Sequence, residues 1–136
     1  MNLIKSKSKA LDIAKAASSK KALDTVIIDM RGVPSVADYF VVTSGASSAQ
    51  VRAITDNIIK QLKRKRQSPW HVEGKAESLW VLVDYGDVIA HIFYDETRHF
   101  YNLERLWGDA PQEHFKEKVK ARKIRYGSKR RKTSDN

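Results

Sequence analysis

The sequence predicts a single α/β domain in which helices cover a mixed β-sheet. Three observations support this prediction. The chain has 136 residues, about the length of one domain. Helical and strand-like patterns follow one another in the order helix, strand, strand, helix, three strands, helix. The predicted strands are apolar on both faces, which favours a sheet buried beneath helices over a sheet that faces water.

The first half of the chain contains two predicted helices and two predicted strands. Apolar residues recur at three- and four-residue steps over 6–20, which predicts a helix. The β-branched run 25–28 and the apolar run 39–43 predict strands. A Ser-x-x-Gln capping box then opens a second amphipathic helix, which is expected over 47–66.

The second half of the chain is dominated by a predicted hairpin. A short extended piece at 70–72 precedes two strands, 79–84 and 88–94. The residues 84–87 between them have the composition of a tight turn. A last amphipathic pattern predicts a helix over 100–107, which Gly and Pro residues terminate.

Basic charge is concentrated at the end of the chain. The whole chain has a net charge of +10, and 112–136 contain ten Lys/Arg against three Asp/Glu, a balance of +7. We therefore expect a domain over 1–111 and a basic, mostly disordered tail over 112–136. Such a tail attracts polyanions by counterion release. A solubilising appendage is the alternative interpretation.

The composition excludes several classes of site. The chain has no cysteine, which rules out disulfides, thiolate zinc sites and a cysteine nucleophile and fits a reducing compartment. It has no apolar run near the roughly 18 residues that span a bilayer. The first residues do not resemble a secretory signal. A cytoplasmic protein without a membrane segment is the expectation.

Catalytic motifs are missing from the sequence. The six glycines form neither a Walker loop nor a dinucleotide fingerprint, and the four histidines lack the spacing of a helical zinc motif. The Gly/Ser turn at 44–48 opens a helix and could contact a phosphate, as in nucleotidyltransferases. Those enzymes also need closely spaced carboxylates for magnesium, and no acidic residue here has another two positions away. An ordinary capped helix start remains the main interpretation, and we expect no catalytic residue, metal or cofactor.

The predicted hairpin is the most distinctive segment. Along 79–84, Trp80 alternates with Val81 and so faces the opposite side of the sheet. Trp and Tyr beside carboxylates at a sheet end are typical of interaction hot spots. Core packing of Trp80 is an equally open interpretation. For His91, within the last predicted strand, a hydrogen-bonded and partly buried imidazole is expected. The basic cluster at 60–66 complements the dipole of its helix.

Three blocks of sequence resemble the Iojap/ribosomal silencing factor family. They read D-x-R-G-x-x-S-x-x-D-Y-F-V-V-x-S-G-x-S-S-x-Q-V over 29–51, W-V-L-x-D-Y-G-D-V-I-x-H-x-F over 80–93, preceded by Glu73-Gly74, and R-x-x-Y-x-L-E-x-L-W over 98–107. The blocks stand in family order, and the resemblance covers about 11–111. Several blocks in register are far more specific than any one of them.

The resemblance implies a function without catalysis. Members resemble degenerate nucleotidyltransferases in fold and are regarded as non-catalytic. They bind the large ribosomal subunit through the ribosomal protein of the L-fourteen family. Occupying that face blocks joining of the small subunit and represses translation when nutrients are limiting. A role in late large-subunit assembly is also associated with the family, and members often form homodimers off the ribosome.

The resemblance also implies which residues face the partner. Carried over by position, the candidates are Glu73, Gly74, Trp80, Asp84, Tyr85, Gly86, Asp87 and His91, flanked by Arg98. Many members stop soon after the Leu-Trp motif, whereas this chain continues for 29 residues past Trp107. The charge of that tail leads to the hypothesis that it contacts ribosomal RNA near the docking site.

Overall fold

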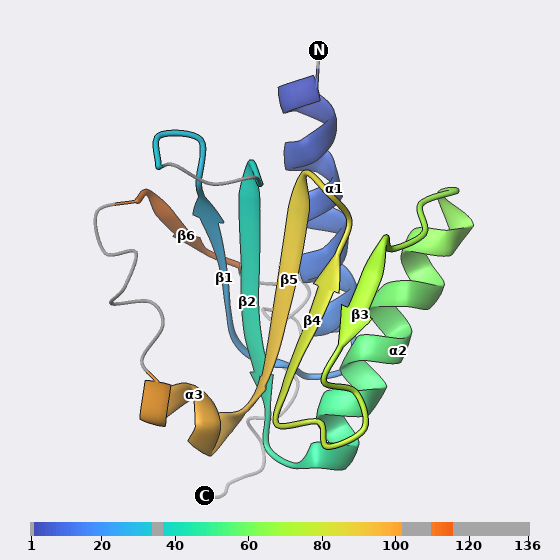
Figure 1. Cartoon of the computed structure of the whole chain (residues 1–136), viewed down its shortest axis with the longest axis vertical. Coiled ribbons are helices and arrows are strands. Elements are labelled where there is room, and N and C mark those ends of the chain that lie inside the picture. Colours follow the sequence, from blue (N-terminus) through green and yellow to red (C-terminus); the bar gives the residue numbers. More distant parts are fainter. Residues whose placement is uncertain (1, 34–36, 102–109, 116–136) are drawn as a thin grey trace, which may run out of the picture.

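The computed structural model describes residues 2–33, 37–101 and 110–115. It contains a six-stranded sheet with two long helices on one face (Figure 1). In chain order the elements are α1 (Asn2–Ser18), β1 (Leu23–Asp29), β2 (Tyr39–Gly45), α2 (Ser48–Arg64), β3 (His71–Glu73), β4 (Trp80–Asp84), β5 (Val88–Tyr94), α3 (Asp95–Tyr101) and β6 (Gln112–His114). The predicted α/β fold and the order of its first eight elements are confirmed.

The sheet is mixed, as predicted. Its strand order is β3-β4-β5-β2-β1-β6, and β2 and β5 at its centre run parallel. All other neighbours are antiparallel. Because parallel neighbours need a crossover connection, α2 and the β3–β4 pair both lie between β2 and β5 in the sequence. The hairpin of β4 and β5 therefore builds one half of the sheet.

Two apolar clusters form the core, one on each face of the sheet. The larger cluster joins α1 and α2 to the strands through side chains such as Ile13, Ile54 and Val81. The second cluster lies on the opposite face and includes Phe40 and Phe93. All seven residues of β2 are buried, which explains why its sequence shows no polar alternation.

The capping box predicted at the start of α2 is present and does more than cap the helix. The Gln50 backbone N–H donates to Ser47 Oγ over 3.1 Å, and the Ala46 N–H donates to Gln50 Oε1 over 2.7 Å. The amide group Nε2 of Gln50 also donates to the carbonyls of Lys20 and Lys21. The end of α1 is thereby tied to the start of α2.

The sheet continues past the expected domain boundary. Residue 111 was the predicted end of the domain, but β6 follows it directly and pairs with β1. The Phe115 N–H donates to the Thr25 carbonyl over 2.8 Å, and its side chain packs against the core. The three residues of β6 are polar and pair with β1 through backbone hydrogen bonds, so their sequence shows no apolar pattern. The remainder of the predicted tail, 116–136, lies outside the described residues.

The helices differ from prediction at their ends. α1 begins at Asn2, about a turn before the predicted start. The last helix begins at Asp95 directly after β5 and is described to Tyr101, whereas the apolar pattern predicted 100–107; residues 102–109 lie outside the described part. Among the helices of the described ranges, none is long and apolar enough to cross a membrane.

Candidate docking surface at the hairpin

The nine residues singled out from the sequence do not form one cluster. β4 has five residues, so its two ends lie about 14 Å apart. Trp80 stands at its start, near Glu73 and Gly74. Glu73 pairs with Leu82, two residues after Trp80. The turn residues 84–87 stand at the far end, and His91 lies between the two ends on β5. The hairpin therefore offers two separate contact regions.

Trp80 is the candidate with the geometry of a contact residue. Its side chain is 37% exposed at the margin of the sheet face opposite α1 and α2. The buried part of the indole packs on Phe93, with ring centroids 4.9 Å apart. The indole Nε1–H donates to Nδ1 of His91 over 3.1 Å. A large aromatic side chain held in one orientation loses little entropy on binding, which suits an interface anchor.

His91 is buried and holds Trp80 in place. Its side chain is 5% exposed and meets the Phe40 ring at 4.8 Å in an edge-on arrangement. Burial lowers the pKa of His91 to about 4, because the charged imidazolium is poorly solvated there. The neutral ring can accept the Trp80 hydrogen bond at Nδ1. The expectation of a buried, hydrogen-bonded histidine is confirmed, whereas direct contact with a partner is contradicted by its burial.

Tyr85 is also a core residue, which corrects its assignment as an exposed tip residue. It is 3% exposed and belongs to the cluster beneath the helices. Its hydroxyl is buried without a hydrogen-bond partner among the described residues. Burial raises the pKa of this hydroxyl to about 12. Part of this burial comes from α1, because Lys9 Nζ lies 5.9 Å from the Tyr85 ring centroid and covers the ring from one side.

The turn around Tyr85 is fixed by its polar neighbours. Asp84 Oδ1 accepts from the Gly86 N–H over 2.7 Å, and the Tyr85 N–H donates to the Val88 carbonyl over 2.9 Å. Asp87 forms an ion pair with Lys9 of α1 at 2.7 Å. Asp84 and Asp87 are both partly exposed, so a partner could reach them, but the charge of Asp87 is already balanced by Lys9.

Gly74 and Gly86 let two backbone segments approach closely. Both have positive φ, +84° and +90°. A Cβ on Gly74 would lie 2.2 Å from the Trp80 carbonyl oxygen, and a Cβ on Gly86 would lie 2.8 Å from the Trp70 ring. These glycines shape the two ends of the hairpin and contribute to a docking surface through their backbone.

Arg98 does not flank the partner-facing candidates of the hairpin, although the resemblance placed it beside them. It is 6% exposed, and its Nη1 donates to Ser44 Oγ over 2.9 Å and to the Leu23 carbonyl over 3.3 Å. Arg98 thus fastens α3 to the ends of β1 and β2. A buried arginine in such a role looks the same in sequence as one at an interface.

Two exposed apolar side chains were missed by the sequence reasoning. Trp70 is 79% exposed and lies against Gly86 at the turn end of the hairpin, and Leu79 is 47% exposed beside Trp80. Trp70 directly precedes a three-residue strand with little apolar content, which was the available signal. We call the set Glu73, Gly74, Leu79, Trp80, Asp84, Gly86, Asp87 and Trp70 the hairpin surface.

The Gly/Ser turn before α2 is an ordinary capped helix start. Ser47 and Gln50 satisfy its first backbone N–H groups, and Ser44 is buried against Arg98. Among residues 2–33, 37–101 and 110–115 no group of three His, Asp or Glu side chains could hold a metal ion. The hairpin surface is partly aromatic, through Trp70 and Trp80, and carries the carboxylates of Glu73, Asp84 and Asp87.

Comparison with known proteins gives consistent matches. The family model described as "Ribosomal silencing factor during starvation" matches residues 4–136. The chain is 46% identical over 98 residues to the ribosomal silencing factor RsfS of Bacillus subtilis (strain 168), covering 72% of this chain and 83% of that one. It is 34% identical over 91 residues to "Mitochondrial assembly of ribosomal large subunit protein 1" of Mus musculus, covering 65% of this chain and 40% of that protein.

The fold has a counterpart among solved structures. A crystal structure of a protein from Chromobacterium violaceum superposes with a TM-score of 0.73 at 29% sequence identity. The match covers 76% of this chain and 86% of that one. The arrangement of strands and helices described above is therefore shared with an experimentally determined relative.

Proposed function

Because this chain belongs to the ribosomal silencing factor family, we propose that it binds the large ribosomal subunit and sterically blocks joining of the small subunit. The contact on the large subunit is the ribosomal protein of the L-fourteen family. Bound there when nutrients are limiting, the protein represses translation. The mechanism is mutual exclusion, since one bound domain covers a surface that the other subunit needs.

The observation that carries this proposal is the state of Trp80. Its indole is partly exposed, yet a buried histidine and a buried phenylalanine fix its orientation. Truncation of such a preorganised aromatic anchor typically weakens the binding free energy of an interface by about 2 kcal/mol or more. Two acidic side chains, Glu73 near Trp80 and Asp84 at the turn end of the hairpin, complement a basic ribosomal protein.

The candidate residues then divide into two roles. Those of the hairpin surface contact the partner, and Tyr85 and His91 position them from inside the fold, whereas Arg98 fastens α3 to β1 and β2. No bond is made or broken in this activity, so the protein acts without a cofactor and not as an enzyme. We further propose that it works in the cytoplasm, forms a homodimer when off the ribosome, and contacts ribosomal RNA with its basic tail.

A second candidate function is late assembly of the large subunit. It is supported by the name of the mouse relative, a mitochondrial assembly protein of that subunit. Both functions use the same docking event. They differ in whether the bound subunit is mature, so depletion of the protein should leave large-subunit precursors only if assembly is the main role.

The test is a reassociation assay with purified ribosomal subunits on sucrose gradients. Added protein should lower the fraction of joined ribosomes, and Trp80→Ala should lose this effect. Leu23→Ala is the matched control, because Leu23 is exposed to the same 37% but lies on β1, away from the hairpin. Equal activity of the wild type and Trp80→Ala, with both folded, would show that docking does not use Trp80. An unchanged fraction of joined ribosomes with the wild type would sink the proposal itself.

A further inference from the structure

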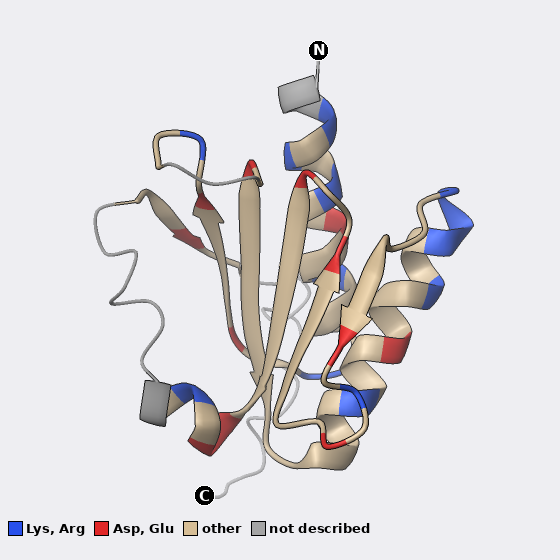
Figure 2. Cartoon of the chain, in the orientation of Figure 1, with Lys and Arg blue, Asp and Glu red and all other residues tan. Residues whose placement is uncertain are grey.

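The two helices and their ends carry most of the basic charge of the described fold. Residues 2–21 and 48–66 contain twelve Lys/Arg and two Asp/Glu, a balance of +10. The other described residues contain three Lys/Arg and ten Asp/Glu, a balance of −7. Figure 2 shows the basic residues along α1 and α2 and the acidic ones mainly at the ends of the strands. The described fold is therefore basic on α1 and α2 and acidic elsewhere, although the two charges largely cancel in the total.

Many of these cations are exposed and unneutralised. The two acidic residues of the helices are both paired, Asp12 with Lys65 at 3.1 Å and Asp56 with Lys75 at 2.6 Å. No ion pair within the described part of the chain involves the exposed side chains Lys15, Lys60, Lys63, Arg64 and Arg66. The helix dipoles account for Lys15 in the last turn of α1 and for Lys63 and Arg64 in the last turn of α2, but not for Lys5 near the start of α1.

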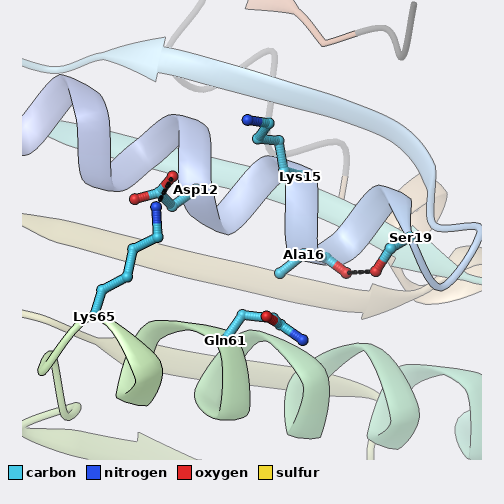
Figure 3. Close-up of a pocket in the computed structure, with 6 residues that line it drawn as sticks. All are labelled: Asp12, Lys15, Ala16, Ser19, Gln61 and Lys65. Carbon is cyan, nitrogen blue, oxygen red and sulfur yellow. Dashed lines mark hydrogen bonds and ion pairs between the residues drawn. The ribbon is translucent and has the colours of Figure 1, made fainter. Parts of the chain in front are cut away.

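A groove between the two helices is lined by four lysines, Lys5, Lys9, Lys15 and Lys65, and by two carboxylates, Asp12 and Asp87, each of which is paired with one of these lysines. The other exposed cations named above lie toward the end of α2 or just after it, outside the groove. Figure 3 shows one part of it, about 330 Å³, with Lys15 on α1 and Gln61 on α2. A second part of about 310 Å³ adjoins it, since Asp12 and Lys65 line both. Lys5 and Lys9 line the second part. The groove thus runs along α1 and is lined by lysines of α1 and by Lys65 at the end of α2.

The chemistry of this face selects the kind of partner. The large exposed apolar side chains of the described residues are Leu23, Trp70, Leu79 and Trp80, and none belongs to α1 or α2. Insertion into a membrane needs such side chains, and stacking on unpaired bases needs exposed aromatic rings. Dispersed lysines and arginines without them match a phosphodiester backbone, where they displace condensed counterions.

We propose that the face formed by α1 and α2, from Lys5 to Lys20 and from Arg52 to Arg66, binds the sugar–phosphate backbone of RNA without sequence specificity. Trp80 lies on the opposite face of the sheet, because its neighbour Val81 points into the cluster beneath the helices. One domain can therefore engage a protein with the Trp80 end of the hairpin surface and RNA with the helices, while Asp87 at the other end borders the groove. This goes beyond the docking proposed above and does not depend on it.

The test measures binding of the full chain to a short fluorescent RNA duplex over a series of salt concentrations. Replacing four exposed cations, as K15Q/K60Q/K63Q/R64Q, should weaken binding and reduce the slope of log K against log salt by about 3. A matched variant, K129Q/R130Q/R131Q/K132Q, removes the same charge from the tail and measures its contribution separately. The variant K15R/K60R/K63R/R64K keeps the charge and should bind as the wild type does.

Three outcomes would overturn the proposal. The first is a salt slope for K15Q/K60Q/K63Q/R64Q that equals that of the wild type. The second is equal loss of RNA binding in the charge-preserving variant while its circular dichroism matches that of the wild type, because binding would then not depend on the charge of this face. The third is tighter binding of this face to phosphatidylserine vesicles than to RNA. Because no ribosome is present in this assay, its result is independent of whether the protein blocks subunit joining.

Discussion

Trp80 and His91 form a pair in which a buried imidazole holds an exposed indole. The Trp80 Nε1–H donates to His91 Nδ1 over 3.1 Å across the two strands of the hairpin. The two residues lie on the same face, at diagonal positions of neighbouring strands, because Trp80 pairs with Phe93 and Leu82 pairs with His91. The pair joins the docking surface to the core, and its two members should respond differently to substitution.

Loss of the Trp80 hydrogen bond alone should be measurable. Trp80→Phe keeps an aromatic ring on Phe93 but leaves the buried acceptor of His91 without this donor. We expect the free energy of unfolding to fall by about 1–2 kcal/mol, measured by urea denaturation. Trp70→Phe is the control, because Trp70 is 79% exposed and should change stability by no more than about 0.5 kcal/mol. Equal effects of both substitutions would contradict the role assigned to the pair.

The buried His91 should make stability depend on pH in the acidic range. Its pKa in the folded protein is about 4, below the usual 6.5, so between these values the unfolded chain binds a proton that the folded protein excludes. Stability should therefore fall as pH drops from about 6.5 to 4, by roughly 3 kcal/mol from this residue. His91→Phe should flatten that part of the curve relative to the wild type. A parallel pH dependence of the two proteins would show that His91 is readily protonated in the fold.

The Tyr85 hydroxyl should be dispensable although its ring is essential. The hydroxyl is buried without a partner among the described residues, so Tyr85→Phe removes a desolvation cost and should leave stability unchanged or raise it slightly. Tyr85→Ala leaves a cavity in the core and should cost about 3–5 kcal/mol. Thermal unfolding of both variants checks this. A large loss in Tyr85→Phe would mean that the hydroxyl is bonded in solution.

The two glycines of the hairpin should differ in tolerance. An alanine Cβ at Gly74 would collide with the Trp80 backbone carbonyl at 2.2 Å, and the strand cannot move aside cheaply. At Gly86 the collision is with the ring of Trp70, an exposed side chain that can rotate away. Gly74→Ala should therefore destabilise the fold more than Gly86→Ala, although both bear the strain of a positive φ (about 1 kcal/mol or more). The reverse order in urea denaturation would refute this reading of the contacts.

Local patterns in the sequence predicted most of the fold. The apolar periodicity of α2 and its Ser47–Gln50 cap are properties of a few neighbouring residues, and both are confirmed. β6 was missed because its pairing with β1 uses backbone groups that every sequence has. Its place depends on where the chain returns to the sheet, which periodicity does not encode.

The candidate site was predicted less completely than the fold. Tyr85 stands in a turn, where side chains are usually exposed, and only the docking of α1 buries it. Arg98 likewise becomes internal because β1 begins and β2 ends beside it. The opposite error concerns Trp70, which no described residue covers. For Tyr85 and Arg98 the deciding contact comes from a residue distant in the chain.

Both edges of the sheet are closed by strands of only three residues. β3 and β6 carry exposed polar or charged side chains, with Val72 the one apolar residue among their six positions. A second copy that tried to extend the sheet by pairing at an edge would find few free backbone groups and would have to desolvate charges. The short, polar terminal strands thus disfavour edge-to-edge pairing of a sheet that is rich in valine and isoleucine.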